Sequence, residues 1–341
     1  MFNPDSVETT VVGLGSAGIK VAALLSKESL LVDRFVYVSC DGDDFDCTDE
    51  GTKILIECPP GRVLTPAVVR GLAFGSHQKI RSALNGSRVV FVVAGLGGAT
   101  GSGLAPLVSS LSNECGATTV GVAVMPFSYE KKMIFPAGVT LRRLRKVARG
   151  VIVVDNDTLM RSSPRDTLVN LFEVANKEAV KALGALLSRP SGVSVPLGLN
   201  KLLGAVLQDG YALLGMSSSG SADKAEDALA GAVVSIGKVA KAGEANRAVI
   251  ALSGDGSLSA TDIGVVVGRL GPMLNREDVD VEYCVNYSGT SQLQVSLLAS
   301  GFKSTKYDDY DPLAKVLGDR VLDDEPDSWV PDVLGMVASC E

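Results

Sequence analysis

The sequence predicts an α/β protein with a parallel-sheet nucleotide-binding domain, a central helix and a smaller α/β domain. Two glycine-rich loops, at 13–18 and 95–103, each follow a short apolar run and precede a helical pattern. Strand, glycine loop and helix in this order are typical of phosphate sites, because glycines admit the ligand and the first amides of a helix lack partners. Apolar residues at helical spacing from Leu168 to Leu187 predict the central helix.

Composition narrows the class of protein. The chain has 341 residues, 46% of them hydrophobic, enough for a large core and two domains. A net charge of −7 argues against nucleic acid as a partner. The six cysteines lack C-x-x-C spacing, so we expect neither a zinc site nor a disulfide framework. No transmembrane-length apolar run or signal peptide is recognisable, so we expect a cytoplasmic protein without direct membrane insertion.

The first glycine loop, taken alone, fits a dinucleotide site. Gly13-Leu14-Gly15-Ser16-Ala17-Gly18 matches G-x-G-x-x-G, and Asp41 follows the next predicted strand, where an acid would contact a ribose. A Rossmann-type, NAD-dependent oxidoreductase is therefore one alternative. The second glycine loop argues against it, because a dinucleotide site needs only one such loop.

The second loop is longer and more specific. A predicted strand at 89–94 enters Gly95-Leu96-Gly97-Gly98-Ala99-Thr100-Gly101-Ser102-Gly103, where five glycines are interleaved with two hydroxyls. This loop resembles the tubulin signature in the form used by the bacterial and archaeal division protein FtsZ. It differs from a Walker loop, which ends in Lys-Ser/Thr. The resemblance runs from about Val11 to Phe302 and indicates a divergent member of the FtsZ/tubulin superfamily.

The resemblance implies a site for GTP or GDP between the two loops. Glu130 ends a segment similar to the family's ribose-contacting Pro-Phe-x-x-Glu, and Asn156 lies in one similar to Pro-Asn-Asp-x-Leu. Lys20 stands where the family usually has asparagine. Mg²⁺ is a candidate companion ion, and no residue is assigned as a metal ligand. The expected nucleotide contacts are Gly13, Gly15, Ser16, Ala17, Lys20, Asp41, Gly95, Gly97, Gly98, Ala99, Thr100, Gly101, Ser102, Glu130, Asn156, Phe172 and Asn176.

Phe172 and Asn176 match the family's Phe-x-x-x-Asn pair on the central helix. They are one turn apart on one helical face, so they could stack on a purine and hydrogen-bond to its edge. The alternative for Phe172 is an ordinary core aromatic. The match in place and spacing favours the guanine site.

One functional loop of the family is altered. The family hydrolyses GTP between subunits with a loop ending in Asn-x-Asp-x-x-Asp, and the matching segment here is 196–201. Gly198 and Lys201 replace the two acids, and only Asn200 or Lys201 remains to orient water or neutralise phosphate. We predict no catalytic residue in this loop and GTP hydrolysis that is lost or very slow, because a general base must lie within hydrogen-bond reach.

The predicted organisation is a nucleotide-binding domain with the central helix at 1–188, an α/β domain at 189–302 and an acidic tail at 303–341. Expected elements of the second domain include a helix at 200–214. The expected function is an FtsZ-like cytoskeletal protein that self-associates head to tail. Its alternative is a non-polymerising regulator of an active FtsZ. The tail is a candidate site for an active FtsZ or a membrane adaptor, unless Trp329 folds back onto the second domain.

Overall fold

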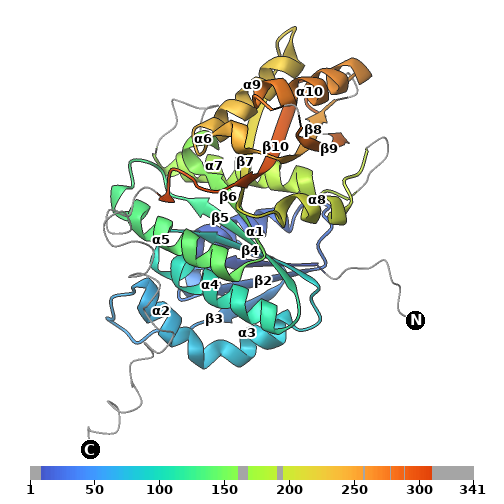
Figure 1. Ribbon diagram of the computed structural model, residues 1–341. Helices are drawn as coiled ribbons and strands as arrows, with labels where there is room; N and C mark the ends of the chain where they lie inside the picture. Colours follow the sequence, from blue (N-terminus) through green and yellow to red (C-terminus); the bar gives the residue numbers. More distant parts are fainter. Residues whose placement is uncertain are drawn as a thin grey trace, which may run out of the picture.

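The computed structural model describes residues 9–159, 168–189, 195–255, 258–276, 278–287 and 289–308. These residues form one ten-stranded sheet with helices on both faces (Figure 1). The strands are β1 (Thr9–Leu14), β2 (Arg34–Ser39), β3 (Thr52–Leu55), β4 (Val89–Gly95), β5 (Thr118–Met125), β6 (Gly150–Asp155), β7 (Tyr211–Ser219), β8 (Arg247–Gly254), β9 (Asp280–Tyr287) and β10 (Leu293–Phe302).

The sheet is mostly parallel, which confirms the predicted fold class. Its strand order is β3-β2-β1-β4-β5-β6-β7-β10-β8-β9. Only β10 is antiparallel to its neighbours, β7 and β8. The sheet therefore runs without a break through both predicted domains, joined where β6 pairs with β7.

Helices cover both faces of the sheet, so the central strands are apolar throughout. The helices are α1 (Gly15–Leu25), α2 (Pro66–Ala73), α3 (His77–Leu84), α4 (Ala99–Glu114), α5 (Lys131–Val147), α6 (Asn156–Leu159), α7 (Leu168–Leu187), α8 (Leu199–Val206), α9 (Lys224–Gly237) and α10 (Ala260–Met273). One core cluster joins α1, α7 and α8 to the sheet, and the other joins α2–α5, α9 and α10. In β4, Val90 and Val92 face one cluster while Phe91 and Val93 face the other, as strand alternation requires. Within the described ranges, no helix is long and apolar enough to cross a membrane.

The predicted helix at 200–214 is wrong. Its first half is α8, but its second half is the start of β7. Gly210 breaks the helix with a φ of 106°, and a Cβ there would lie 2.3 Å from the Phe302 carbonyl oxygen. The run 211–214 is buried between β6 and β10, and periodicity does not separate a short buried strand from a helix. No predicted element corresponds to β3 or β9, the two edge strands of the sheet.

Beyond β10, the chain packs against the first domain. Tyr307 is 2% exposed. Its carbonyl oxygen would lie 2.6 Å from a Cβ at Gly138 of α5. Lys306 forms an ion pair with Asp155, whose side chain is 1% exposed at the end of β6. The predicted tail thus begins with a packed stretch, and its remainder from 309, including Trp329, lies outside the described residues.

Candidate nucleotide-binding site

The two glycine loops meet at the point where the strand order reverses. β1 and β4 are parallel neighbours inside the sheet, away from both of its edge strands. After β1 the chain continues to β2 on one side, and after β4 it continues to β5 on the other. The helices that follow these strands pack on opposite faces of the sheet, α1 in one core cluster and α4 in the other. Open α/β sheets bind ligands at such a switch point.

Both helices begin inside the glycine loops. The glycine patterns suggested helix starts near Ile19 and Leu104, but α1 starts at Gly15 and α4 at Ala99. Neither helix has a capping side-chain hydrogen bond or an acid in its first turn. The first backbone amides and the positive ends of two helix dipoles therefore lie close together at one edge of the sheet, an arrangement suited to an anion.

Close backbone contacts explain several of the glycines. Gly15 has a φ of 63°, and a Cβ there would lie 3.1 Å from the Thr100 Cβ. A Cβ at Gly101 would lie 2.2 Å from the Gly95 carbonyl oxygen, so the second loop cannot fold this way with a larger residue. At Gly98, by contrast, a Cβ would meet nothing within 4 Å. This open position beside helix α4 gives a phosphate group room to approach, so the loops fit the expected ligand.

The hydroxyls of the loops differ in their surroundings. Ser102 is 5% exposed. Its Oγ accepts a hydrogen bond of 2.8 Å from the Gly97 amide, so this side chain shapes the loop from within. Ser16 and Lys20 are exposed on α1, whereas Thr100 is half-buried at the start of α4. The structure therefore brings the predicted phosphate-binding residues together from both loops.

The end of β2 lies beside the second loop. Asp41 is exposed, and its carboxylate accepts a hydrogen bond of 3.1 Å from the Asp43 amide. Burial raises the pKa of the neighbouring Cys40 thiol to about 12. The nearby Cys58 adds to this rise in pKa, while Thr100 of the second loop acts in the opposite direction. Cys40 is therefore neutral at neutral pH and places no negative charge next to the phosphate loop.

An aromatic cluster, consisting of Phe127, Tyr129 and Phe172, lies between the end of β5 and the central helix α7. The Phe127 ring stacks on Tyr129 at 5.1 Å and meets Phe172 edge-on at 5.3 Å. Phe172 is 44% exposed and Tyr129 is 49% exposed. This exposure excludes the core alternative for Phe172 and leaves two rings available to a base. Tyr129 was missed because its position in the Pro-Phe-x-x-Glu segment is a variable one.

The polar groups of this region are held by local hydrogen bonds. Glu130 accepts a hydrogen bond of 2.8 Å from the Phe127 amide. Asp157 accepts hydrogen bonds from the amide and hydroxyl of Ser128. Asn156 is 7% exposed at the start of α6. These contacts fix the loop after β5 against the end of β6, next to the aromatic cluster.

The altered loop lies at the opposite edge of the sheet. Its Gly198 precedes α8, which packs near the amino-terminal ends of β7 and β8. Lys201 in the first turn of α8 forms an ion pair of 2.7 Å with Glu282 of β9. If Lys201 is to neutralise the charge of a phosphate, as suggested from the sequence, it must first leave Glu282. Glu282 was missed because it lies 81 residues away in sequence.

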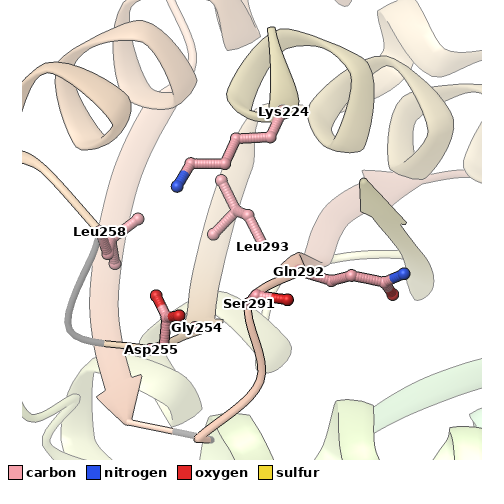
Figure 2. A pocket seen from close by; sticks show the side chains of 7 residues that line it. All are labelled: Lys224, Gly254, Asp255, Leu258, Ser291, Gln292 and Leu293. Carbon is pink, nitrogen blue, oxygen red and sulfur yellow. The ribbon is translucent and has the colours of Figure 1, made fainter. Parts of the chain in front are cut away.

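A small pocket lies elsewhere, in the second domain (Figure 2). It is found between the start of α9, the end of β8 and the start of β10, where Lys224 extends toward Leu258 and Leu293. None of the residues that line it belongs to either glycine loop. We therefore do not include it in the nucleotide site. Across the described ranges, no three His, Cys, Asp or Glu side chains lie close enough to hold a metal.

Comparisons with known proteins identify the family. The model of the family described as "Tubulin/FtsZ family, GTPase domain" matches residues 8–164 of this chain. The cell division protein FtsZ of Methanothermobacter thermautotrophicus is 33% identical over 277 residues, which are 78% of this chain and 72% of that protein. This chain belongs to the tubulin/FtsZ family. In Pyrococcus horikoshii FtsZ 1, at 32% identity, the match spans only 60% of the relative's length.

Solved structures agree with this assignment. A point mutant of FtsZ from M. jannaschii has a TM-score of 0.77 at 27% identity, covering 87% of this chain and 91% of its own. CetZ2 from Haloferax volcanii, solved as a GTPγS-bound protofilament, has a TM-score of 0.70 at 22% identity, covering 88% and 95%. The second likeness concerns the fold alone. The family assignment rests on the sequence relatives.

Proposed function

We propose that this chain binds GTP or GDP between its two glycine loops and self-associates head to tail, with GTP hydrolysis lost or very slow. The observation that carries the proposal is the convergence of two uncapped helix N-termini, α1 and α4, at the β1–β4 switch point. Membership of a family of GTPases supports guanine nucleotide as the ligand. In this proposal the loop amides hold the phosphates and Glu130 contacts the ribose.

The aromatic cluster supplies the base site in this proposal. Phe172 offers an exposed face on α7, and Asn176, one turn further, is half-buried on the same helix. Stacking recognises any base, so the amide of Asn176 carries the choice of purine through its hydrogen bonds. Asp41 lies near the phosphate loop through its neighbour Cys40 and remains a candidate ribose contact.

The positions of the two loops support head-to-tail assembly. The glycine loops lie at the carboxyl edge of the sheet. The Gly198 loop precedes α8, whose Gly204 accepts a hydrogen bond from Arg247 at the amino-terminal end of β8. The central helix α7 has 20 residues and would span about 30 Å between these edges. A chain therefore cannot bring its own α8 loop to its own nucleotide. A second copy could, and this heterologous contact would repeat into an open filament. The CetZ2 protofilament provides a precedent within the fold.

A non-polymerising regulator of an active FtsZ is the second candidate. The replacement of both loop acids by Gly198 and Lys201 favours it, because a chain that does not complete a neighbour's site has no need of them. A cytoplasmic location, the domain ranges and an adaptor-binding tail remain predictions. The two candidates differ in one property, which is self-assembly.

Calorimetry and electron microscopy test these proposals. The purified chain is titrated with GTP, GDP and NADH, and then imaged with GTP, with GDP and without nucleotide. We expect binding of both guanine nucleotides and filaments with GTP. NADH binding without guanine binding would overturn the nucleotide assignment. Guanine binding without filaments at any concentration would favour the regulator.

A further inference from the structure

The structure brings a carboxylate to the loop that lost its acids. Along the sequence, no acid lies between Glu178 and Asp209, so the loop before α8 has none of its own. Across the fold, however, Glu282 of β9 lies 2.7 Å from the amine of Lys201. Lys201 stands where the family resemblance puts the second acid. A carboxylate is therefore present next to this loop, paired with the amine of Lys201 instead of attached to α8.

This placement is fixed by backbone contacts. The segment before α8 joins the edge of the sheet, because Val195 and Val285 exchange two backbone hydrogen bonds of 3.1 and 3.0 Å. Glu282 lies close to this bridge in sequence, on a strand that is paired with β8 over its whole length. Its side chain is 34% exposed and that of Lys201 is 57% exposed. The pair is accessible from outside the chain at the amino edge.

We propose that Glu282 is the carboxylate that this chain presents to the nucleotide of the next subunit, and that Lys201 restrains it. The proposal rests on the head-to-tail assembly proposed above. The hydrogen bond to Lys201 occupies an oxygen that a water molecule would otherwise use. The slow hydrolysis expected of this chain then has a cause in the ion pair, in addition to the missing loop acids.

The reaction balances with Glu282 as the proton acceptor. Water attacks the γ-phosphorus of the neighbour's GTP, and the bond between that phosphorus and the β–γ bridging oxygen breaks. GDP leaves with the electron pair of this bond, and inorganic phosphate is the second product. A proton of the attacking water passes to the Glu282 carboxylate and from there to solvent. Glu282 needs a free oxygen facing the water for this step.

The decisive variant is Lys201→Met, which removes the cation but keeps an apolar side chain of similar length. We expect phosphate release from assembled protein to rise by at least about tenfold, because a positioned base contributes roughly 10²–10⁴-fold to a rate. The double variant Lys201→Met with Glu282→Gln should return to the slow rate of the unmodified protein. Asp280→Asn is the matched control, since Asp280 lies on the same strand in an ion pair with Arg247. It should leave the slow rate unchanged.

Each outcome is informative when GTP binding and sedimentation are measured on the same samples. Failure of the unmodified protein to bind GTP or assemble would overturn the proposed function itself. If the unmodified protein assembles but Lys201→Met shows no gain, Glu282 is not the acceptor. Equal gains in the single and double variants would exclude Glu282 as well. A Lys201→Met protein that binds GTP but no longer assembles would show that the pair serves the contact instead, and this too would overturn the inference.

Discussion

The two edges of the sheet place different demands on the sequence. At the carboxyl edge the candidate site is made largely of backbone, and several of its glycines have no room for a side chain. A Cβ at Gly18 would lie 2.3 Å from the Val93 carbonyl oxygen, and one at Gly101 would lie 2.2 Å from that of Gly95. At the amino edge the site is made of side chains, and a Cβ at Gly198 would meet nothing within 4 Å. The closely packed glycines of the first edge cannot be replaced without disturbing the fold, whereas the exposed residues of the second edge can.

The largest expected effect is the loss of GTP binding when a confined glycine at the carboxyl edge is replaced. Gly101→Val should abolish measurable GTP binding, because its Cβ would collide with the backbone of β4 and push the loop out of shape. Calorimetry measures the binding, and circular dichroism shows whether the chain still folds. A folded Gly101→Val protein with normal GTP affinity would remove the second loop from the site.

Gly98→Ala is the matched variant within the same loop. Its Cβ enters open space at a φ of −78°, so the chain should fold normally. Because Gly98 is the N-cap of α4 and alanine is less favourable there, the free energy of unfolding should fall by less than about 1 kcal/mol. Any loss of GTP affinity then reports contact with the ligand and not damage to the protein. An unchanged affinity would mean that the phosphate does not approach Gly98.

Two ion pairs, one at each edge of the sheet, should differ in how much they contribute to the free energy of unfolding. At the carboxyl edge, Lys306→Met leaves the carboxylate of Asp155 buried without its cation, which should lower the free energy of unfolding by about 3 kcal/mol. At the amino edge, Lys201→Met removes an exposed pair and should cost less than about 1 kcal/mol. Urea unfolding of both variants measures the difference. Equal losses would show that the packed stretch 303–308 does not anchor the carboxyl edge.

Substitutions in the proposed base site should reduce GTP affinity by a smaller amount. Phe172→Ala should weaken GTP binding by about 1–3 kcal/mol, the usual value of stacking between an aromatic ring and a base. Because Phe172 is 44% exposed, the thermal stability of this variant should change little. Asn176→Asp should alter the preference among purine nucleotides, measured with GTP, ITP and ATP. Unchanged affinities in both variants would leave the base site unassigned and turn attention to Tyr129.

Much of the glycine-loop site at the carboxyl edge could be predicted from the sequence. Much less of the region around α8 and β9 could be predicted. Strand, glycine loop and helix are local patterns, so β1, β4 and their loops were located correctly, although each helix starts about a turn earlier than expected. The helix predicted at 200–214 failed because buried strands and helices share the same apolar run. Glu282 could not be found by scanning the loop, since only the pairing of β8 with β9 brings it there. The spacing of residues along a short segment does not predict its contacts with distant segments.

The smallest expected effect on stability comes from restoring one acid in the loop before α8. Gly198→Asp places a carboxylate at the N-cap of α8, where φ is −66° and no side chain caps the helix at present. Aspartate is preferred over glycine at this position by a few tenths of a kcal/mol, and its charge favours the helix dipole. The free energy of unfolding should therefore rise by roughly 0.5 kcal/mol, and phosphate release from filaments should increase.

Gly198→Asn is the control for this variant, because it caps the helix without adding a charge. If both variants gain stability and only Gly198→Asp gains turnover, the loop lies against the neighbour's nucleotide and tolerates change because folding does not depend on it. If neither gains turnover while filaments still form with GTP, the α8 loop lies away from the phosphate and the head-to-tail arrangement must be revised.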